Sequence, residues 1–191
     1  MTRVMYDGVS ALAAGIAAIR PQMVAGYVNG AYAWDAGDWA LFPHADHVTI
    51  SVNASANVGD VLDVESGDAT PGQVAEWIRM RKAAGVFRPT VYCSRDTIPA
   101  VRAGSGAYIL GVDYDIWVGD WTGAAHQVIA PPPGAAVACA ATQYESTPHW
   151  DVSEVYDDGW PHRTPPAPPA PAGPTKADAL AALATLSRYV G

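Results

Sequence analysis

Two acidic residues, Asp63 and Glu65, stand at alternate positions at the end of a short apolar run. The β-branched residues before them and Gly67 after them predict a buried strand over residues 60–65. Because residues i and i+2 of a strand face the same side, the two carboxyl groups leave the backbone roughly 6.5–7 Å apart. Carboxyl pairs about 5–9.5 Å apart hydrolyse glycosidic bonds. The alternative is a strand end whose acids simply meet solvent.

Other acidic residues occupy similar positions. Asp7 follows an apolar run at 4–6, Asp120 follows one at 116–118, and Asp151 belongs to a short apolar segment near residue 152. In a barrel of parallel strands, residues at the carboxyl ends of different strands converge on one rim. The sequence therefore predicts a cluster of acids from distant parts of the chain.

The elements that must position these acids alternate along the first half of the chain. Helices are predicted from Ser10 to Arg20, from Thr70 to Gly85 with Gln73 completing a capping box, and from Ser94 to about residue 103. Strands are predicted at 4–6, 23–28, 47–52, 60–65, 89–93, 116–121, 137–144 and 150–153, with a weaker candidate at 108–112.

This order favours a parallel sheet, and about eight strands in about 160 residues favour a compact TIM-like (β/α) barrel with irregular later repeats. The later connections are short and are expected to lack helices. The alternative is an open doubly wound sheet, although no Gly-x-Gly-x-x-Gly stretch marks a nucleotide site. The aromatic segment 31–43 is expected to form a short helical loop or a packed turn.

Composition narrows the function classes. The 191 residues carry a net charge of −8 without a Lys/Arg cluster, which argues against a nucleic-acid or anionic-membrane partner. Cys93 and Cys139 are expected to be buried free thiols. The five histidines show no paired spacing, so neither a metal nor an organic cofactor is implied. Residues 1–7 do not form a signal peptide, and no apolar run is long enough to span a membrane.

The chain is predicted to divide into a barrel at 1–163, a Pro/Ala-rich spacer at 164–174 and an amphipathic helix at 175–191. Leu183, Leu186 and Val190 share one face of that helix. A helix of this length is marginal alone in water, so we expect it to dock on the barrel or on another copy of the chain.

Five short motifs together resemble glycoside hydrolase family 25, the lysozyme-like muramidases of bacteria and of phage endolysins. The resemblance covers about residues 3–160. The segment at 25–30 lacks the charged residues expected there, and the insert at 31–43 looks closer to the related glycoside-hydrolase-like barrels of actinobacteria and their phages. The motifs are Tyr6-Asp7-Gly8-Val9-Ser10, Asp63-Val64-Glu65, Pro89-Thr90-Val91-Tyr92, Trp117-Val118-Gly119-Asp120-Trp121, and Gln143-Tyr144 with Trp150-Asp151-Val152.

The resemblance implies hydrolysis of the β-1,4 bond between N-acetylmuramic acid and N-acetylglucosamine in peptidoglycan. Glu65 would be the general acid, and Asp63 would stabilise the oxocarbenium-like state or orient the acetamido group of the substrate. Asp7 and Asp151 would flank them and tune their charge. The candidate substrate-binding residues are Tyr27, Tyr92, Asp120, Trp121 and Gln143.

A second hypothesis is a non-catalytic carbohydrate-binding or virion-surface barrel of the same fold. Without a signal peptide, an enzyme of this kind would be made in the cytoplasm and would reach the wall after release or on a phage particle.

Overall fold

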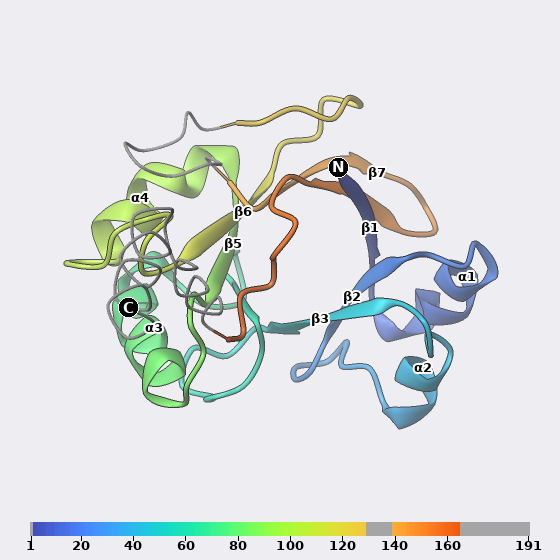
Figure 1. Ribbon diagram of the computed structural model, residues 1–191, viewed down its shortest axis with the longest axis horizontal. Helices are drawn as coiled ribbons and strands as arrows, with labels where there is room; N and C mark the ends of the chain where they lie inside the picture. Colours follow the sequence, from blue (N-terminus) through green and yellow to red (C-terminus); the bar gives the residue numbers. More distant parts are fainter. Residues whose placement is uncertain (1, 129–138, 165–191) are drawn as a thin grey trace, which may run out of the picture.

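A computed structural model describes residues 2–128 and 139–164. Its eight strands close into a barrel in which each strand pairs with its neighbour in chain order and β8 pairs with β1 (Figure 1). The α/β barrel predicted from the sequence is therefore confirmed, and the open doubly wound sheet is excluded. The strands are β1 (Arg3–Asp7), β2 (Met23–Tyr27), β3 (Asp46–Ser51), β4 (Val61–Asp63), β5 (Thr90–Ser94), β6 (Asp115–Gly119), β7 (Ala141–Ser146) and β8 (Asp151–Val155).

The last strand runs in the opposite direction to the others. Strands β1 to β7 pair in parallel, whereas β8 is antiparallel to both β7 and β1. A parallel connection needs about a dozen residues, and only residues 147–150 separate β7 from β8, so the two strands form a hairpin. The expectation of a parallel sheet is wrong for this strand.

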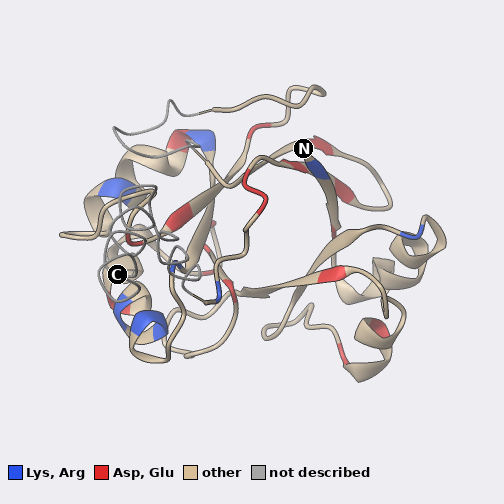
Figure 2. Ribbon diagram, in the orientation of Figure 1, with Lys and Arg blue, Asp and Glu red and all other residues tan. Residues whose placement is uncertain are grey.

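Short helices cover two opposite sides of the barrel, α1 and α2 on one side and α3 and α4 on the other (Figure 1). They are α1 (Ala13–Ala18), α2 (Ala36–Ala40), α3 (Val74–Ala83) and α4 (Ile98–Gly104), with 3-10 turns at Ser10–Leu12, Pro71–Gln73 and Arg95–Thr97. The Lys and Arg residues of these helices lie on α3 and α4 (Figure 2). The described residues that follow β6 contain no helix, as expected for the later connections.

The apolar core has three parts. Inside the barrel, inward-facing residues such as Met5, Val48 and Trp117 form one buried cluster. Outside it, Trp77 of α3 packs with strand residues in a second cluster, and Trp34 packs with α1 in a third. Each large apolar side chain buried in this way contributes roughly 1.5–3 kcal/mol to folding. The helices thus hold the sheet from outside while the interior side chains fix its closure.

The segment after β8 closes the amino end of the barrel and, in Figure 1, crosses in front of it in orange. Trp160 is 1% exposed, and its indole N–H donates to Oγ1 of Thr90 at 2.7 Å. Arg163 donates to both oxygens of Asp60, from Nε at 2.8 Å and from an Nη at 2.7 Å. The guanidinium of Arg3 donates to the carbonyl of Trp160 at 2.7 Å. The segment therefore covers the amino end of the barrel, and a ligand could enter there only if the segment were displaced.

Several local expectations need correction. Residues 108–112 form turns rather than a strand, with an isolated bridge between Leu110 and Tyr114. Ser10 does not cap a helix; it begins a 3-10 turn, and its hydroxyl donates to Asp38 at 2.6 Å. The capping role of Gln73 is confirmed, because its Oε1 accepts from the backbone N–H of Thr70 at 2.9 Å.

The remaining expectations concern the cysteines, membrane-spanning helices and the end of the chain. Cys93 and Cys139 are buried free thiols, as predicted. Within the described ranges, no helix is long and apolar enough to cross a membrane. The predicted spacer beyond Thr164 and the helix at 175–191 lie outside the described residues, so the three-part division of the chain stays a prediction.

Candidate active site

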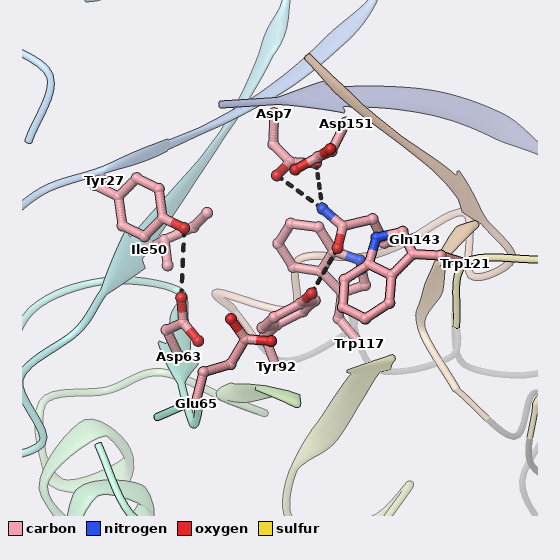
Figure 3. A pocket seen from close by; sticks show the side chains of 10 residues that line it. All are labelled: Asp7, Tyr27, Ile50, Asp63, Glu65, Tyr92, Trp117, Trp121, Gln143 and Asp151. Carbon is pink, nitrogen blue, oxygen red and sulfur yellow. Dashed lines mark hydrogen bonds between the residues drawn. The ribbon is translucent and has the colours of Figure 1, made fainter. Parts of the chain in front are cut away.

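A pocket of about 100 Å³ opens at the carboxyl ends of the parallel strands (Figure 3). It brings together eight of the nine residues that the sequence nominated, and Asp120 is the exception. The carboxyl groups of Asp63 and Glu65 lie on one side of it, and those of Asp7 and Asp151 lie on the other (Figure 3). Its lining residues are Asp7, Tyr27, Ile50, Asp63, Glu65, Tyr92, Trp117, Trp121, Gln143 and Asp151.

Strand ends place these groups at one rim. Asp7 is the last residue of β1, Tyr27 of β2 and Asp63 of β4. Asp151 is the first residue of β8 and pairs directly with Asp7. In a parallel strand, a first residue would lie at the opposite end of the barrel from a last one. The reversed direction of β8 is therefore what brings Asp151 to the other acids.

Glu65 lies just beyond β4, on the turn that follows the strand. The backbone N–H of Val64 donates to the carbonyl of Tyr92 at 2.9 Å, which extends the pairing with β5 by one residue. The N–H of Ala69 then returns to the carbonyl of Asp63 at 3.2 Å. This tight turn keeps Glu65 beside Asp63 and leaves its side chain at the open edge of the pocket, where solvent reaches it.

Gln143 links two other lining residues across the barrel interior. Its Nε2 donates to both oxygens of Asp7, at 3.0 and 3.2 Å, and its Oε1 accepts from the hydroxyl of Tyr92 at 2.5 Å. Asp7 is 4% exposed, and burial together with the neighbouring Asp151 raises its pKa well above the ordinary value, while the Gln143 hydrogen bond lowers it. Burial likewise raises the pKa of Tyr92.

Asp63 is more deeply buried than Glu65. It is 2% exposed, and burial, followed by the charges of Glu65 and Asp68, raises its pKa to about 8. The hydroxyl of Tyr27 donates to its Oδ2 at 3.4 Å, whereas its buried Oδ1 has no hydrogen-bond partner among the described residues. At neutral pH, Asp63 therefore holds a proton and keeps one oxygen free for a ligand.

The two remaining carboxyl groups are also pushed toward the protonated form. Burial raises the pKa of Glu65, and the charges of Asp68 and Asp151 raise it further. Burial raises the pKa of Asp151 against the opposing effect of Ser146. Like charges this close cannot all ionise at once, so the group titrates as a coupled set that retains protons above the usual range for carboxylic acids.

Aromatic side chains form the rest of the wall. Trp121 is 50% exposed and offers a ring face to solvent at the pocket edge. Trp117 is buried and donates from its indole N–H to Oγ of Ser153 at 3.0 Å. A side chain on Gly119 would meet the Tyr92 hydroxyl at 2.7 Å and the ring of Trp121 at 3.0 Å, so the absence of a Cβ lets both approach.

Sequence reasoning nominated neither Ile50 nor Trp117 as a site residue, and it did not nominate Asp68, whose charge acts on Asp63 and Glu65. The alternation of inward and outward residues along a strand could have identified Ile50 and Trp117. Ile50 stands two residues from Val48 of the interior cluster, and Trp117 alternates with Ile116 and Val118, which belong to the outer cluster. Asp68 lies in a turn, where the sequence pattern does not predict which way a side chain points, and its charge affects the two acids without a hydrogen bond to them.

Asp120 lies outside the pocket. Its Oδ2 accepts from Arg95 at 3.2 Å and lies 2.8 Å from Nε2 of His126. It lines a neighbouring hollow of about 360 Å³, which shares Trp121 with the pocket. A third hollow, of about 170 Å³, shares Asp7, Tyr27 and Asp151 with the pocket. Each of these two hollows therefore adjoins the pocket, at different lining residues. Within the described residues, no group of three or more His, Cys, Asp or Glu residues is arranged to hold a metal ion.

Comparison with known proteins identifies the architecture. No protein-family model and no curated protein matches the chain. Solved structures with this fold include two glycoside hydrolases of family 25. One is GHIP, described as a glycosyl hydrolase 25 of Streptococcus pneumoniae that participates in host cell invasion, with a TM-score of 0.52, 10% identity, and coverage of 82% of this chain and 87% of that one. The other is a family GH25 lysozyme from Aspergillus fumigatus, with a TM-score of 0.50, 13% identity, and coverage of 82% and 95%. The resemblance inferred from the motifs is thus confirmed for the fold.

Proposed function

We propose that the protein is a glycoside hydrolase that cleaves the β-1,4 bond between N-acetylmuramic acid and N-acetylglucosamine in bacterial peptidoglycan. The observation that carries the proposal is the convergence of Asp7, Asp63, Glu65 and Asp151 in one rim pocket of a barrel that shares its fold with lysozymes of glycoside hydrolase family 25. Glycosidic cleavage needs a proton donor and a second carboxyl group beside the scissile bond. The pocket supplies both.

Glu65 acts as the general acid. It lies at the open edge of the pocket, where a leaving-group oxygen of an extended glycan can reach it, and its raised pKa favours the protonated form that an acid needs. Burial raises the pKa of Asp63 to about 8, so Asp63 competes with Glu65 for a proton in the free protein. Substrate binding must therefore shift the proton of the coupled pair toward Glu65.

The free oxygen of Asp63 explains how that shift occurs. The acetamido N–H of the sugar donates to Oδ1, which has no hydrogen-bond partner among the described residues. A donated hydrogen bond stabilises the ionised carboxylate and lowers its pKa. Ionised Asp63 raises the pKa of Glu65 in turn, and it orients the acetamido oxygen or stabilises positive charge at the anomeric carbon.

The pocket with its two adjoining hollows fits a polymer better than a single sugar. The central pocket of about 100 Å³ is smaller than the ~300–1,000 Å³ that encloses a whole small ligand. It holds the reacting part of one sugar, while the flanking hollows continue past Trp121 on one side and Trp150 on the other. An extended glycan lying across the rim would be cut within its length.

Digestion of purified peptidoglycan tests the proposal. The wild type should generate new reducing ends, with N-acetylmuramic acid at the reducing end of the products identified by mass spectrometry. The Glu65→Gln variant should be slower by roughly 10²–10⁴-fold, because a positioned general acid contributes that much. Glu76→Gln is the matched control, since Glu76 lies exposed on α3 and pairs with Arg79 at 2.6 Å.

Equal cleavage rates for the wild type and Glu65→Gln would show that Glu65 is not the general acid. Binding to the wall by the wild type without any release of reducing ends would instead support the non-catalytic carbohydrate-binding barrel. We also propose that the protein reaches the wall after release from the cell that makes it, or on a phage particle. Immunodetection of the protein in purified particles and in lysates separates these two routes.

A further inference from the structure

The hollow beside the pocket, on the far side of Trp121, has a different character from the acidic site. It has a volume of about 360 Å³ and is lined by Ser94, Arg95, Asp96, Gly119, Asp120 and Trp121. The described residues that line the central pocket and its two adjoining hollows include one basic side chain, that of Arg95. A ligand that continues past Trp121 therefore passes from carboxyl groups to a guanidinium.

Most of the hydrogen-bonding capacity of Arg95 is unused. Its side chain is 62% exposed, and Nη1 donates to Oδ2 of Asp120 at 3.2 Å. A guanidinium carries five N–H donors in a planar fork, and no other hydrogen bond from this one is made to a described residue. The Asp120 contact uses one donor, and the others stay available to a carboxylate, which a planar guanidinium can bind through two parallel hydrogen bonds.

His126 is the second side-chain partner of Asp120. Its Nε2 lies 2.8 Å from the Asp120 carboxylate, and its Nδ1 lies 2.7 Å from the carbonyl oxygen of Ala124. Both partners are acceptors, so the ring satisfies both only when both nitrogens carry protons, and these hydrogen bonds raise the pKa of His126. The Asp120 carboxylate is therefore shared between His126 and Arg95 rather than held by Arg95 alone.

Asp96 completes the set with the opposite sign. It lines the same hollow, so a guanidinium and a free carboxylate are presented together. A neutral sugar matches neither charge. A short peptide offers both a carboxylate for Arg95 and an amino group for Asp96, and in peptidoglycan such peptides are attached to the muramic acid residues of the glycan.

We propose that this hollow binds the peptide substituent of the glycan, with Arg95 receiving a peptide carboxylate, while Trp121 supports the sugar next to it. The proposal rests on the glycan-cleaving function proposed above and names the part of the substrate that sets specificity. It predicts that glycans bearing peptides bind more tightly than bare glycans of the same length.

Binding measured in the Glu65→Gln background, where turnover does not interfere, tests this inference. Three probes are titrated calorimetrically: a soluble peptidoglycan fragment with its peptides, the same fragment after an amidase has removed them and exposed the lactyl carboxylate, and a chitin oligosaccharide, which has no carboxylate. Adding Arg95→Gln should weaken binding of the peptide-bearing fragment by about tenfold or more and leave the chitin oligosaccharide unchanged. Arg95→Lys, which keeps the charge without the fork, should weaken it less.

Arg102→Gln is the matched control, because Arg102 is exposed on α4 and lines none of the three hollows. Three results would overturn the inference. They are unchanged binding of the peptide-bearing fragment, an equal loss for all three probes, and a loss confined to the peptide-free fragment, which would assign Arg95 to the lactyl carboxylate. Hydrolysis of bare glycan strands by the wild type, measured separately, shows whether the proposed function stands when this inference fails.

Discussion

The hydroxyl of Tyr92 donates a 2.5 Å hydrogen bond to Oε1 of Gln143. Because an amide presents its nitrogen opposite its oxygen, this contact turns Nε2 of Gln143 toward Asp7, where it donates to both carboxyl oxygens. Strands β5, β7 and β1 are thereby linked through the interior of the barrel. Gln143 and Tyr92 line the pocket, but their polar atoms bind each other and Asp7. Their main role is therefore to position Asp7.

Tyr92→Phe should destabilise the protein and slow peptidoglycan cleavage. The substitution leaves Oε1 of the buried Gln143 without its donor, a loss of about 1–3 kcal/mol in the free energy of unfolding. It also frees the amide to rotate away from Asp7, so the cleavage rate should fall. Urea denaturation and reducing-end assays measure both effects. Tyr144→Phe, at a half-buried position outside the pocket, is the control, and equal behaviour of the two variants would refute the positioning role.

The free energy of unfolding should fall as pH rises from about 4 to about 8. The pKa of Asp63 is about 8 in the folded protein and about 3.9 in an unfolded chain, so the folded state binds more protons between these values. The stabilisation is complete below the unfolded pKa and is lost as pH rises through the folded one. The slope is at most about 1.4 kcal/mol per pH unit for one group.

Asp63→Asn should flatten this dependence and should be more stable than the wild type at pH 9, because a neutral amide replaces a carboxylate that is buried and ionised there. Asp96→Asn, at an exposed position, is the control. Urea denaturation at pH 5, 7 and 9 provides the comparison. Parallel curves for the wild type and Asp63→Asn would show that Asp63 titrates normally in the folded protein.

Gly119→Ala should lower cleavage by tenfold or more while the barrel stays folded. The added Cβ would lie 2.7 Å from the Tyr92 hydroxyl and 3.0 Å from the ring of Trp121, so at least one of them must move. Displacements of about 1 Å in such sites cost up to roughly 10²-fold in rate. Gly72→Ala is the control, since nothing lies within 4 Å of its Cβ. A Gly119→Ala enzyme as fast as Gly72→Ala would show that this close approach is dispensable.

Two truncations should behave differently. A chain ending at Thr164 keeps Trp160 and Arg163 and serves as the reference. A chain ending at Asp158 loses the Trp160 side chain that fills the amino end and the guanidinium that pairs with Asp60. Removing a buried Trp costs about 3–5 kcal/mol, so its melting temperature should drop by many degrees. If the two chains melt together, the closing segment contributes nothing to stability.

The sequence predicted most of the fold because each strand carries its own local signal. The β-branched run before Asp63 and the capping pair of Thr70 and Gln73 mark elements that the structure contains. The direction of β8 was missed because it depends on the length of the preceding turn rather than on the strand residues. The segment 108–112 is apolar enough for a strand, but it turns back on itself through the contact between Leu110 and Tyr114.

For the site, strand-end positions were sufficient to nominate the residues but could not describe how they interact. Asp7 and Gln143 are 136 positions apart, and no periodicity predicts that one amide will bridge Asp7 to Tyr92. Asp120 follows a strand as the other acids do, yet its partners Arg95 and His126 draw it to the next hollow. The proton on Asp63 follows from burial, which only the folded arrangement determines.

The central claim is that the carboxyl cluster at the rim holds a proton at neutral pH. Carboxyl-carbon NMR of protein labelled at Asp and Glu, with Asp63→Asn and Glu65→Gln used to assign the signals, measures this directly. The Asp63 carboxyl should titrate with an apparent pKa near 8, and the Glu65 carboxyl should titrate above its ordinary range. Titration of both carboxyl groups near pH 4 would contradict it.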